Sequence, residues 1–240
     1  MITAKLHSIE TFGAVDGPGI RTIFFLQGCP ARCLYCHNPD TWSPNKGTEF
    51  TLDDMLHTAK RSIPYYGEDG GVTFSGGDPL MQGRFVLEAI KLLKMNNIGT
   101  VIDTSGTYID AYTDDIVKEC EMLLMDVKHS DPKQFEEISG CKQDTLLELI
   151  EMANKHNTPV WVRQVIVPGI NDTEENIVEL ANFIKKHIKN VYKTELLGYH
   201  VLALNKYQKL GMEYRLKGVK AMDKKRLAKL MELLNEEMKK

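Results

Sequence analysis

The stretch RTIFFLQGCPARCLYC, residues 21–36, leads from an apolar run rich in β-branched and aromatic residues directly into three cysteines. Short runs of this kind are typical of buried strands in a parallel sheet. Five more follow, at residues 71–75, 99–104, 122–127, 159–167 and 194–199. Longer stretches of helical period separate them, which predicts an α/β fold of repeated β/α units. Because six units close only part of an eight-stranded barrel, we expect a partial (β/α)6 open barrel with a lateral mouth and an N-terminal extension.

Helices are predicted where apolar residues recur at helical spacing between these strands. The stretches are 52–63, 80–97, 111–120, 144–157 and 171–188, the last with Asp172 or Thr173 as its cap. A C-terminal stretch, 223–240, places Leu227, Leu230, Met231 and Leu234 on one stripe, typical of a packing face. No repeat or composition break marks a linker, so we expect residues 1–240 to form a single domain.

The composition excludes several classes of protein. Of 240 residues, 42% are hydrophobic and 26% charged, and the formal net charge of −3 provides no general positive field for nucleic acid or a membrane surface. The chain has no apolar run long enough to span a membrane, and residues 1–13 lack the pattern of a signal peptide. We therefore expect a cytoplasmic protein. Its five cysteines do not suggest a disulfide framework, and Cys120 and Cys141, outside the cluster, are interpreted as buried or half-buried small apolar residues.

Residues suited to chemistry follow every predicted strand. They are the cysteines 29–36, SGGD at 75–78, DTSG at 103–106, DVK at 126–128, PG at 168–169 and YH at 199–200. In parallel β/α folds, ligands bind where the carboxyl ends of the strands converge. A lone strand-end Asp or His is often a cap or turn residue, but six such motifs together favour one assembled site.

The cysteine spacing favours an iron–sulfur cluster over zinc. Structural zinc needs four closed ligands, and the chain has no second cysteine pair at the usual spacing. A cubane cluster held by Cys29, Cys33 and Cys36 would leave one iron open to a small molecule. Zinc and unligated thiols remain as alternatives at this point.

CPARCLYC matches the CxxxCxxC signature of radical S-adenosylmethionine (SAM) enzymes. The resemblance narrows to the family of pyruvate formate-lyase activating enzymes and runs over nearly the whole chain. It rests on segments 15–29, 35–42, 71–80, 103–106, 125–128, 161–172 and 199–207. The fold implied is the open barrel of the radical SAM type.

This resemblance implies a [4Fe-4S] cluster on Cys29, Cys33 and Cys36, with SAM chelating the fourth iron. Reductive cleavage of SAM would yield a 5′-deoxyadenosyl radical, which removes hydrogen from a glycine of pyruvate formate-lyase to form a glycyl radical. It also implies an oxidoreductase that acts as a monomer, with flavodoxin or ferredoxin as a low-potential electron donor.

Similarity to this family also implies roles for individual residues. The residues expected to bind SAM are Tyr35, Cys36, His37, Gly76, Gly77, Asp126, Val127, Lys128, Arg163 and His200. Asp103, Thr104 and Asp126, with the backbone carbonyl of Leu124, resemble a monovalent cation site, and solvated rim carboxylates are the competing interpretation. Asp16 and Arg21, in the turn segment VDGPGIR, are expected to contact the partner peptide.

Two positions depart from the family pattern. Asp78 stands where the family usually has Glu, which puts its contact to the SAM amino group in doubt, and Ala203 stands where a glycine is frequent.

Two alternative functions are weighed. Activases of several other glycyl-radical enzymes carry additional cysteines soon after the SAM motif, whereas residues 37–70 contain none. A non-catalytic zinc-binding module would explain the cysteines but leave the other strand-end motifs as coincidence.

Overall fold

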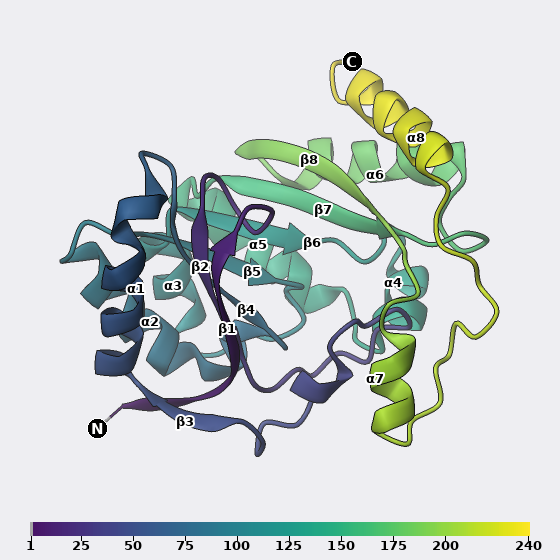
Figure 1. Cartoon of the computed structure of the whole chain (residues 1–240). Helices are drawn as coiled ribbons and strands as arrows, with labels where there is room; N and C mark the ends of the chain where they lie inside the picture. Colours follow the sequence, from purple (N-terminus) through teal and green to yellow (C-terminus); the bar gives the residue numbers. More distant parts are fainter. Residues whose placement is uncertain (1) are drawn as a thin grey trace.

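The fold is built on one eight-stranded sheet, in a computed structural model that describes residues 2–240. The strand order is β3-β1-β2-β4-β5-β6-β7-β8, so the sheet is curved but unclosed (Figure 1). The strands are β1 Thr3–Gly13, β2 Arg21–Leu26, β3 Thr48–Thr51, β4 Gly71–Gly76, β5 Gly99–Thr104, β6 Met122–Asp126, β7 Val160–Ile166 and β8 Val191–Gly198. The last six in this spatial order are parallel neighbours. The predicted partial barrel is confirmed.

The sequence did not predict two of the strands, β1 in the N-terminal extension and β3 directly before α1. β1 pairs antiparallel with both β2 and β3. The second half of β1 is largely exposed and β3 has only four residues, so neither presents the apolar alternation on which a strand prediction depends.

Helices follow each strand of the parallel part. They are α1 Leu52–Tyr66, α2 Gly83–Lys94, α3 Thr113–Glu119, α4 Pro132–Ser139, α5 Asp144–His156, α6 Glu174–His187, α7 Leu204–Lys209 and α8 Lys224–Glu237, with short 3-10 turns η1 Pro39–Thr41 and η2 Pro79–Gln82. The side chain of Thr173, rather than that of Asp172, caps α6 by accepting from the backbone N of Asn176. The short helices α4 and α7 were not predicted, because eight and six residues carry little periodic signal.

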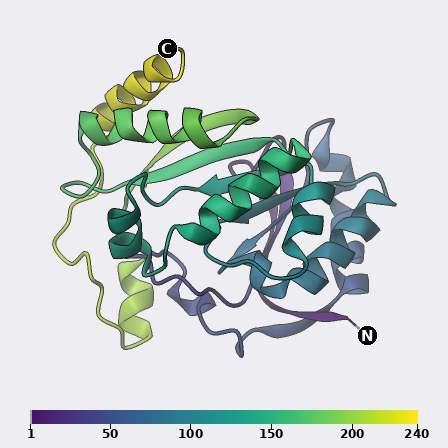
Figure 2. The same cartoon turned by 180° about the vertical axis from the view of Figure 1, so that it is seen from behind.

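The longer helices cover the outer, convex face of the sheet. In Figure 1, α5 and α6 lie behind the sheet, and in Figure 2 the same helices stand in front of it. α8 packs against α6 and β8, and its residues Leu230 and Leu234 are each 1% exposed, as expected of a packing stripe. Within residues 2–240, no helix combines the length and apolar character needed to cross a bilayer.

Side chains along each strand alternate between the core under the helices and the interior of the barrel. On β6, Leu123 and Met125 belong to the large core under the helices, whereas Leu124 packs in a small interior cluster with Val101 and Trp161. Successive strand residues point to opposite faces of a sheet, so Asp126 lies on the same inner face as Leu124. The inner face therefore carries apolar residues low in the barrel and polar residues at the carboxyl ends.

Arg21 fills part of the barrel floor. It is 1% exposed, and its guanidinium donates to Thr73 Oγ1 (2.7 Å) and to the carbonyls of Val72 (2.8 Å) and Pro18 (3.0 Å). Burial lowers the pKa of Arg21 to about 10. Buried charges are tolerated when their hydrogen-bonding groups are satisfied, and this one ties β2, β4 and the preceding turn together.

Candidate active site

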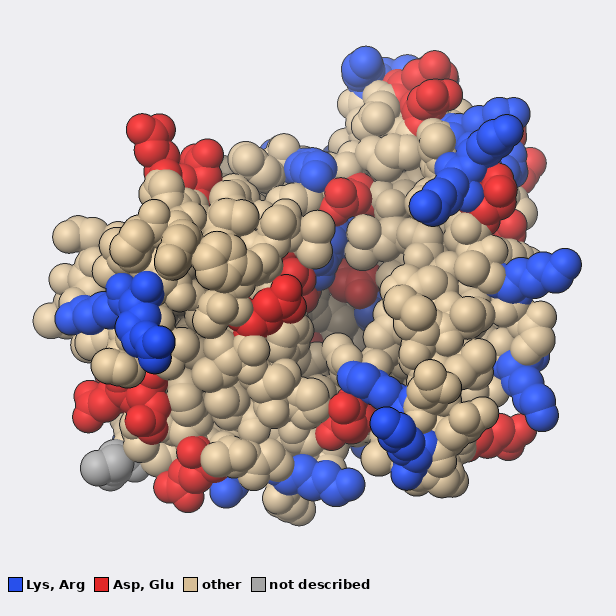
Figure 3. Space-filling model, viewed as in Figure 1, with Lys and Arg blue, Asp and Glu red and all other residues tan. Residues whose placement is uncertain are grey.

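A cavity of about 270 Å³ lies at the carboxyl ends of the parallel strands. In the view of Figure 1, the space-filling model in Figure 3 shows a hollow near the centre of the molecule, with acidic and basic side chains on its walls. The predicted residues that line the cavity are Asp16, Cys29, Cys33, Tyr35, Cys36, His37, Gly76, Gly77, Asp103, Thr104, Asp126, Lys128 and Arg163. The structure thus brings together most of the strand-end motifs in one place.

The cysteine loop is held from two sides by backbone hydrogen bonds. On one side, Arg32 N and Leu34 N donate to the carbonyls at the end of α4, Ser139 O (2.7 Å) and Ile138 O (2.9 Å). On the other, Gly28 N donates to Thr41 O at the end of η1 (2.7 Å). Gly28 has φ +101°, a conformation that favours glycine, where the chain leaves β2. The loop is therefore fixed by segments that follow it in the chain.

All three cysteine side chains face the same cavity and are largely buried. Burial raises the pKa of Cys33 to about 11 and raises the pKa values of Cys29 and Cys36 as well. Within residues 2–240, no three His, Cys, Asp or Glu side chains lie close enough together to hold a single metal ion. The thiolates of a cubane cluster each bind a different iron, so they need not converge on one point as zinc ligands must.

Two buried ion pairs cross the cavity wall. Arg163 on β7 pairs with Asp103 on β5, whose other carboxylate oxygen accepts from Ser75 Oγ on β4 (2.7 Å). Lys128 Nζ lies 2.5 Å from Asp126 Oδ2 and 5.3 Å from the centroid of the Tyr35 ring. Burial opposes the charge on Lys128, but Asp126, Cys33 and Tyr35 together outweigh it, and the pKa of Lys128 is raised.

Several polar atoms on the cavity wall are buried without a hydrogen-bond partner. They are Tyr35 Oη, Trp42 Nε1, Asp126 Oδ1 and Arg163 Nε, all from residues that line the cavity. Buried polar atoms are rarely left unpaired in folded proteins, because each unmade hydrogen bond costs free energy. This concentration of unpaired donors and acceptors indicates a place for a polar ligand.

His37 and His200 meet at the edge of the cavity. Their rings are stacked with centroids 3.9 Å apart, and His37 Nε2 lies 3.2 Å from the carbonyl oxygen of His200. Burial lowers the pKa of His37, which favours the neutral ring. His200 itself is exposed and does not line the cavity.

Gly76 and Gly77 are required by close approach of the chain to itself. A Cβ on Gly77 would lie 2.1 Å from the carbonyl oxygen of Gly28, and one on Gly76 would lie 2.3 Å from backbone atoms of Leu26. Gly76 also has φ +117°. Without a Cβ on either residue, the end of β4 packs closely against the end of β2 and against Gly28.

Asp78 is completely buried behind the cavity wall. Its carboxylate accepts from Thr104 Oγ1 (2.9 Å to each oxygen), from Ser105 Oγ (3.1 Å) and from Leu80 N (3.2 Å). Burial raises the pKa of Asp78 to about 6, although these donors oppose the shift. Asp78 therefore ties the end of β4 to the end of β5 and does not face the cavity.

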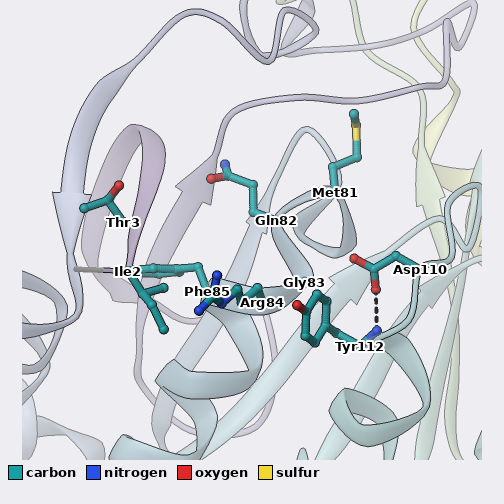
Figure 4. Close-up of a pocket in the computed structure, with 9 residues that line it drawn as sticks. All are labelled: Ile2, Thr3, Met81, Gln82, Gly83, Arg84, Phe85, Asp110 and Tyr112. Carbon is teal, nitrogen blue, oxygen red and sulfur yellow. Dashed lines mark hydrogen bonds between the residues drawn. The ribbon is translucent and has the colours of Figure 1, made fainter.

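A larger cavity, of about 650 Å³, lies between the start of β1, the start of α2 and the loop before α3 (Figure 4). Two of its polar side chains are already paired: Asp110 accepts from Tyr112 N (2.9 Å), and the Gln82 amide donates to Lys5 O (2.8 Å). None of the predicted site residues lines it. The candidate active site is therefore the smaller cavity.

Comparison with known proteins agrees with this geometry. The family model described as the radical SAM superfamily matches residues 23–184, which include the cysteine loop and strands β4 to β7. A pyruvate formate-lyase-activating enzyme of Clostridium pasteurianum is 45% identical over 237 residues, covering 98% of this chain and 99% of its own. The chain belongs to the radical SAM superfamily, among the pyruvate formate-lyase-activating enzymes.

Other relatives support the same assignment. The pyruvate formate-lyase-activating enzyme of Staphylococcus epidermidis is 40% identical, with 93% of this chain and 92% of that protein covered. Among solved structures, a domain of such an enzyme from Bacteroides vulgatus has a TM-score of 0.57 at 23% identity, covering 70% of this chain and 94% of that one, which shows the fold alone. Streptococcus suis SuiB bound to its precursor peptide has a TM-score of 0.66 at 18% identity, with 90% and 45% covered, and shows the fold alone.

The residues present fit the groups that a radical SAM enzyme binds. Three thiols on one loop face a cavity whose walls also offer an unpaired carboxylate oxygen and an unpaired guanidinium nitrogen. Thiolates suit iron–sulfur clusters, and the two polar atoms suit the amino and carboxylate groups of SAM. The predicted [4Fe-4S] cluster and SAM follow from membership of this superfamily.

Three predicted contacts do not fit this geometry. Val127 follows Asp126 on the strand and is buried in the core on the opposite face, with its backbone N–H bonded to Arg163 O (2.9 Å). Arg21 is enclosed in the barrel floor and cannot reach a partner peptide. The hydroxyl of Thr104 is bonded to Asp78, and Asp103 and Asp126 face basic groups, so the structure gives the predicted cation site no support.

Sequence reasoning missed two residues of this radical SAM site. Ser75 was quoted within SGGD without a role, although its position at the end of β4 on the same face as Thr73 predicts that it points inward. Trp42 lies in segment 35–42, and no signal in the sequence alone shows that its ring turns back toward the cysteines.

Proposed function

We propose that this chain is the activase of pyruvate formate-lyase, which generates the glycyl radical of that enzyme. The observation that carries the proposal is the placement of Cys29, Cys33 and Cys36 in one cavity with the Lys128 and Arg163 side chains. Relatives that carry the name pyruvate formate-lyase-activating enzyme over nearly their whole length support the choice of partner.

A [4Fe-4S] cluster and SAM, when bound, supply one-electron cleavage of the sulfonium to a 5′-deoxyadenosyl radical, which removes a hydrogen atom from the glycine α-carbon. Cys29, Cys33 and Cys36 would hold the cluster through their thiolates, and the polar groups of the cavity wall would orient the amino and carboxylate groups of SAM beside it.

The cavity walls orient SAM in this proposal. Arg163 Nε is buried and unpaired, and Lys128 adds a second cation, so both suit a carboxylate. Asp126 Oδ1 is an unpaired acceptor suited to an ammonium group. Tyr35, His37, Gly76 and Gly77 line the remaining wall, and His200 contributes through its stack on His37.

Asp16 is the proposed contact to the partner peptide. It lies on the cavity wall in the turn that precedes β2, and its backbone carbonyl accepts from Thr73 Oγ1 (2.7 Å), which fixes the turn. Burial and the nearby Asp103 raise the pKa of Asp16 to about 6. A carboxyl group in this state can donate to or accept from a peptide backbone.

Other parts of the proposal rest on the resemblance. They are a cytoplasmic location, a monomeric state, and flavodoxin or ferredoxin as electron donor.

The test is anaerobic reconstitution with iron and sulfide, followed by incubation with SAM, a low-potential reductant and pyruvate formate-lyase. We expect release of methionine and 5′-deoxyadenosine and a glycyl doublet in the electron paramagnetic resonance spectrum of the partner. A partner whose target glycine is replaced by alanine is the control and should give no doublet. A colourless protein that retains one zinc, or SAM cleavage without a doublet in this partner, would contradict the proposal.

A further inference from the structure

A strongly basic segment joins β8 to α8. Residues 199–222 contain five basic residues and one acidic residue, although the whole chain has 30 Lys and Arg against 33 Asp and Glu. Four of these cations are exposed, namely Lys209, Arg215, Lys217 and Lys220. Within residues 2–240, none of the four forms an ion pair, so the protein itself does not neutralise their charge.

The inner side of this segment packs against the cysteine loop. Tyr207 and Tyr214 are buried in one cluster with Cys33, and their rings meet with centroids 4.8 Å apart. Cys29 and Cys36 pack against the same cluster. The exposed cations therefore belong to the stretch of chain that covers the cysteines.

Polar contacts fix α7, within this segment, beside the loop. Lys206 Nζ donates to Asn38 Oδ1 (2.8 Å) and lies 3.3 Å from Asp40 Oδ1, which ties α7 to η1 and the residue before it. The position of the segment relative to the cysteines is thus set by the fold.

Arg32 extends the positive charge onto the cysteine loop itself. It is exposed, and its guanidinium carbon lies 4.8 Å from the centroid of the Trp42 ring, which Tyr207 of α7 meets edge-on. In Figure 3, blue side chains lie on both sides of the tan surface at the lower right, where Figure 1 places α7. We call this surface the basic face, formed by Arg32, Lys209, Arg215, Lys217 and Lys220.

Apolar side chains are exposed in the same segment. Leu202 is 78% exposed, Leu210 37% and Met212 36%. Transient protein interfaces combine apolar contacts with a charged rim, whereas the phosphates of a nucleic acid are bound mainly by cations. The mixture of exposed aliphatic and basic side chains therefore fits an acidic protein.

We propose that the basic face docks an acidic one-electron carrier protein, which reduces the cluster from this side of the molecule. The inference rests on the proposed function in one respect: a cluster held by the three cysteines receives its electron from outside the enzyme. The carrier loses one electron and the cluster gains it, and no covalent bond forms or breaks in this step.

Charge complementarity suits a contact that must form and dissociate at each electron transfer. Opposite charges raise the rate of encounter by about 10- to 1,000-fold, and electron-transfer complexes bury little surface. Salt screens this attraction. Reduction by the carrier should therefore be fast at low ionic strength and slow when salt is added.

The test uses the reconstituted full-length enzyme, with a reduced flavodoxin of acidic surface as the probe. Stopped-flow absorbance measures the second-order rate constant of cluster reduction. The basic-face variant combines Lys209→Gln, Arg215→Gln, Lys217→Gln and Lys220→Gln. We expect its rate constant to be about tenfold lower than that of wild type at about 0.01 M ionic strength. At about 1 M, where the Debye length is about 3 Å, most of this difference should disappear.

A matched control removes the same charge elsewhere on the surface. It combines Lys60→Gln, Lys118→Gln, Lys186→Gln and Lys189→Gln, at exposed residues on or next to the outer helices. Because its net charge equals that of the basic-face variant, a rate constant close to wild type would show that the position of the charge matters.

Two further measurements distinguish docking from damage to the cluster. Illuminated 5-deazaflavin needs no protein interface, so it should reduce both variants at the wild-type rate. Carbodiimide coupling joins lysine amines to carboxylates that touch them. In the complex of wild-type enzyme with flavodoxin, mass spectrometry should find Lys209, Lys217 or Lys220 in the coupled peptides.

The outcomes separate this inference from the proposed function. An unchanged rate constant in the basic-face variant, an equal loss in the control, or coupling at other lysines would overturn the inference. Normal reduction by flavodoxin with slower glycyl radical formation would assign the face to pyruvate formate-lyase and would also overturn it. Failure of the wild-type chain to assemble a cluster would overturn both proposals. The expected rates without a glycyl doublet would support the inference and overturn only the activase proposal.

Discussion

Arg163 and Asp103 form an ion pair that spans the strand between them, since β6 lies between β5 and β7 in the sheet. Both side chains are largely buried, at 10% and 16% exposure. Removal of one partner from a buried pair leaves an uncompensated charge, which costs more than the pair itself contributes. The pair therefore stabilises the cavity wall as well as presenting Arg163 Nε.

We predict that Arg163→Gln lowers the free energy of unfolding by about 3 kcal/mol, because the Asp103 carboxylate is left buried without its cation. Urea denaturation of the purified chain measures the loss. Adding Asp103→Asn to Arg163→Gln should recover part of it.

Arg226→Gln is the matched control for that prediction. Arg226 pairs with Glu174 at the surface, with 38% and 65% exposure, so its loss should change stability by about 0.5 kcal/mol or less. Equal losses in the two arginine variants would show that the buried pair has no special cost.

Asp78 should make stability depend on pH between about 4 and 6. Burial raises its pKa to about 6 from an ordinary value of 3.8, so in this range the folded protein keeps a proton that the unfolded chain has released. The free energy of unfolding then falls as pH rises through this range, by about 3 kcal/mol in total from this group. Asp78→Asn removes the titration.

Chemical denaturation of both proteins from pH 4 to pH 7 measures this effect as the difference between two curves. Wild type should lose stability relative to Asp78→Asn as pH rises. Asp16 is a second carboxyl with a pKa of about 6, but it is more exposed than Asp78. Wild type should therefore also lose stability relative to Asp16→Asn as pH rises, by a smaller amount. Parallel wild-type and Asp78→Asn curves would contradict the prediction.

Gly77→Ala should displace the cysteine loop. The added Cβ would meet the Gly28 carbonyl oxygen at 2.1 Å, and backbone cannot move aside as a flexible side chain can. We expect a loss of about 2 kcal/mol in stability and reduced iron content after reconstitution. Gly198→Ala is the control, because its Cβ would meet a Leu227 methyl group at 3.1 Å. Normal iron content in Gly77→Ala would argue that the loop is not tied to β4.

Replacing any one of Cys29, Cys33 or Cys36 by serine should reduce bound iron to roughly half of the wild-type value or less, because a cubane cluster depends on its thiolates. Iron and sulfide analysis measures this. Cys120→Ala should leave iron unchanged, since Cys120 is buried in the core under the helices. Full iron in a cluster-cysteine variant would mean that another residue ligates the metal.

The positions of the strand-end residues were predictable from period-two alternation and from the rule that ligands bind at carboxyl strand ends. Asp103, Asp126 and Arg163 reached one cavity for that reason. Successive side chains on a strand point to opposite faces, so Val127 is expected to point away from the cavity that Asp126 and Lys128 line. The side chain of Val127 could therefore have been assigned to the core from the sequence alone.

Other features depend on contacts between distant segments and were not predictable. Arg21 is charged, which suggests the surface, but a glycine-rich turn and the two strands β4 and β5 supply its buried partners. Asp78 differs from the family pattern by one methylene, and only the structure shows its carboxylate bonded to Thr104 and Ser105. Hydrogen bonds between residues so far apart leave no periodic signal along the chain.

The way the cysteine loop is fastened bears on how the enzyme matures. Arg32 and Leu34 depend on Ser139 and Ile138, and Lys206 donates to Asn38 beside the loop (2.8 Å). A ribosome releases the cysteines long before these anchors, and chains acquire structure as they emerge. Iron delivery should therefore come after most of the polypeptide has been made, and a nascent chain halted near residue 130 should expose three unprotected thiols to oxygen.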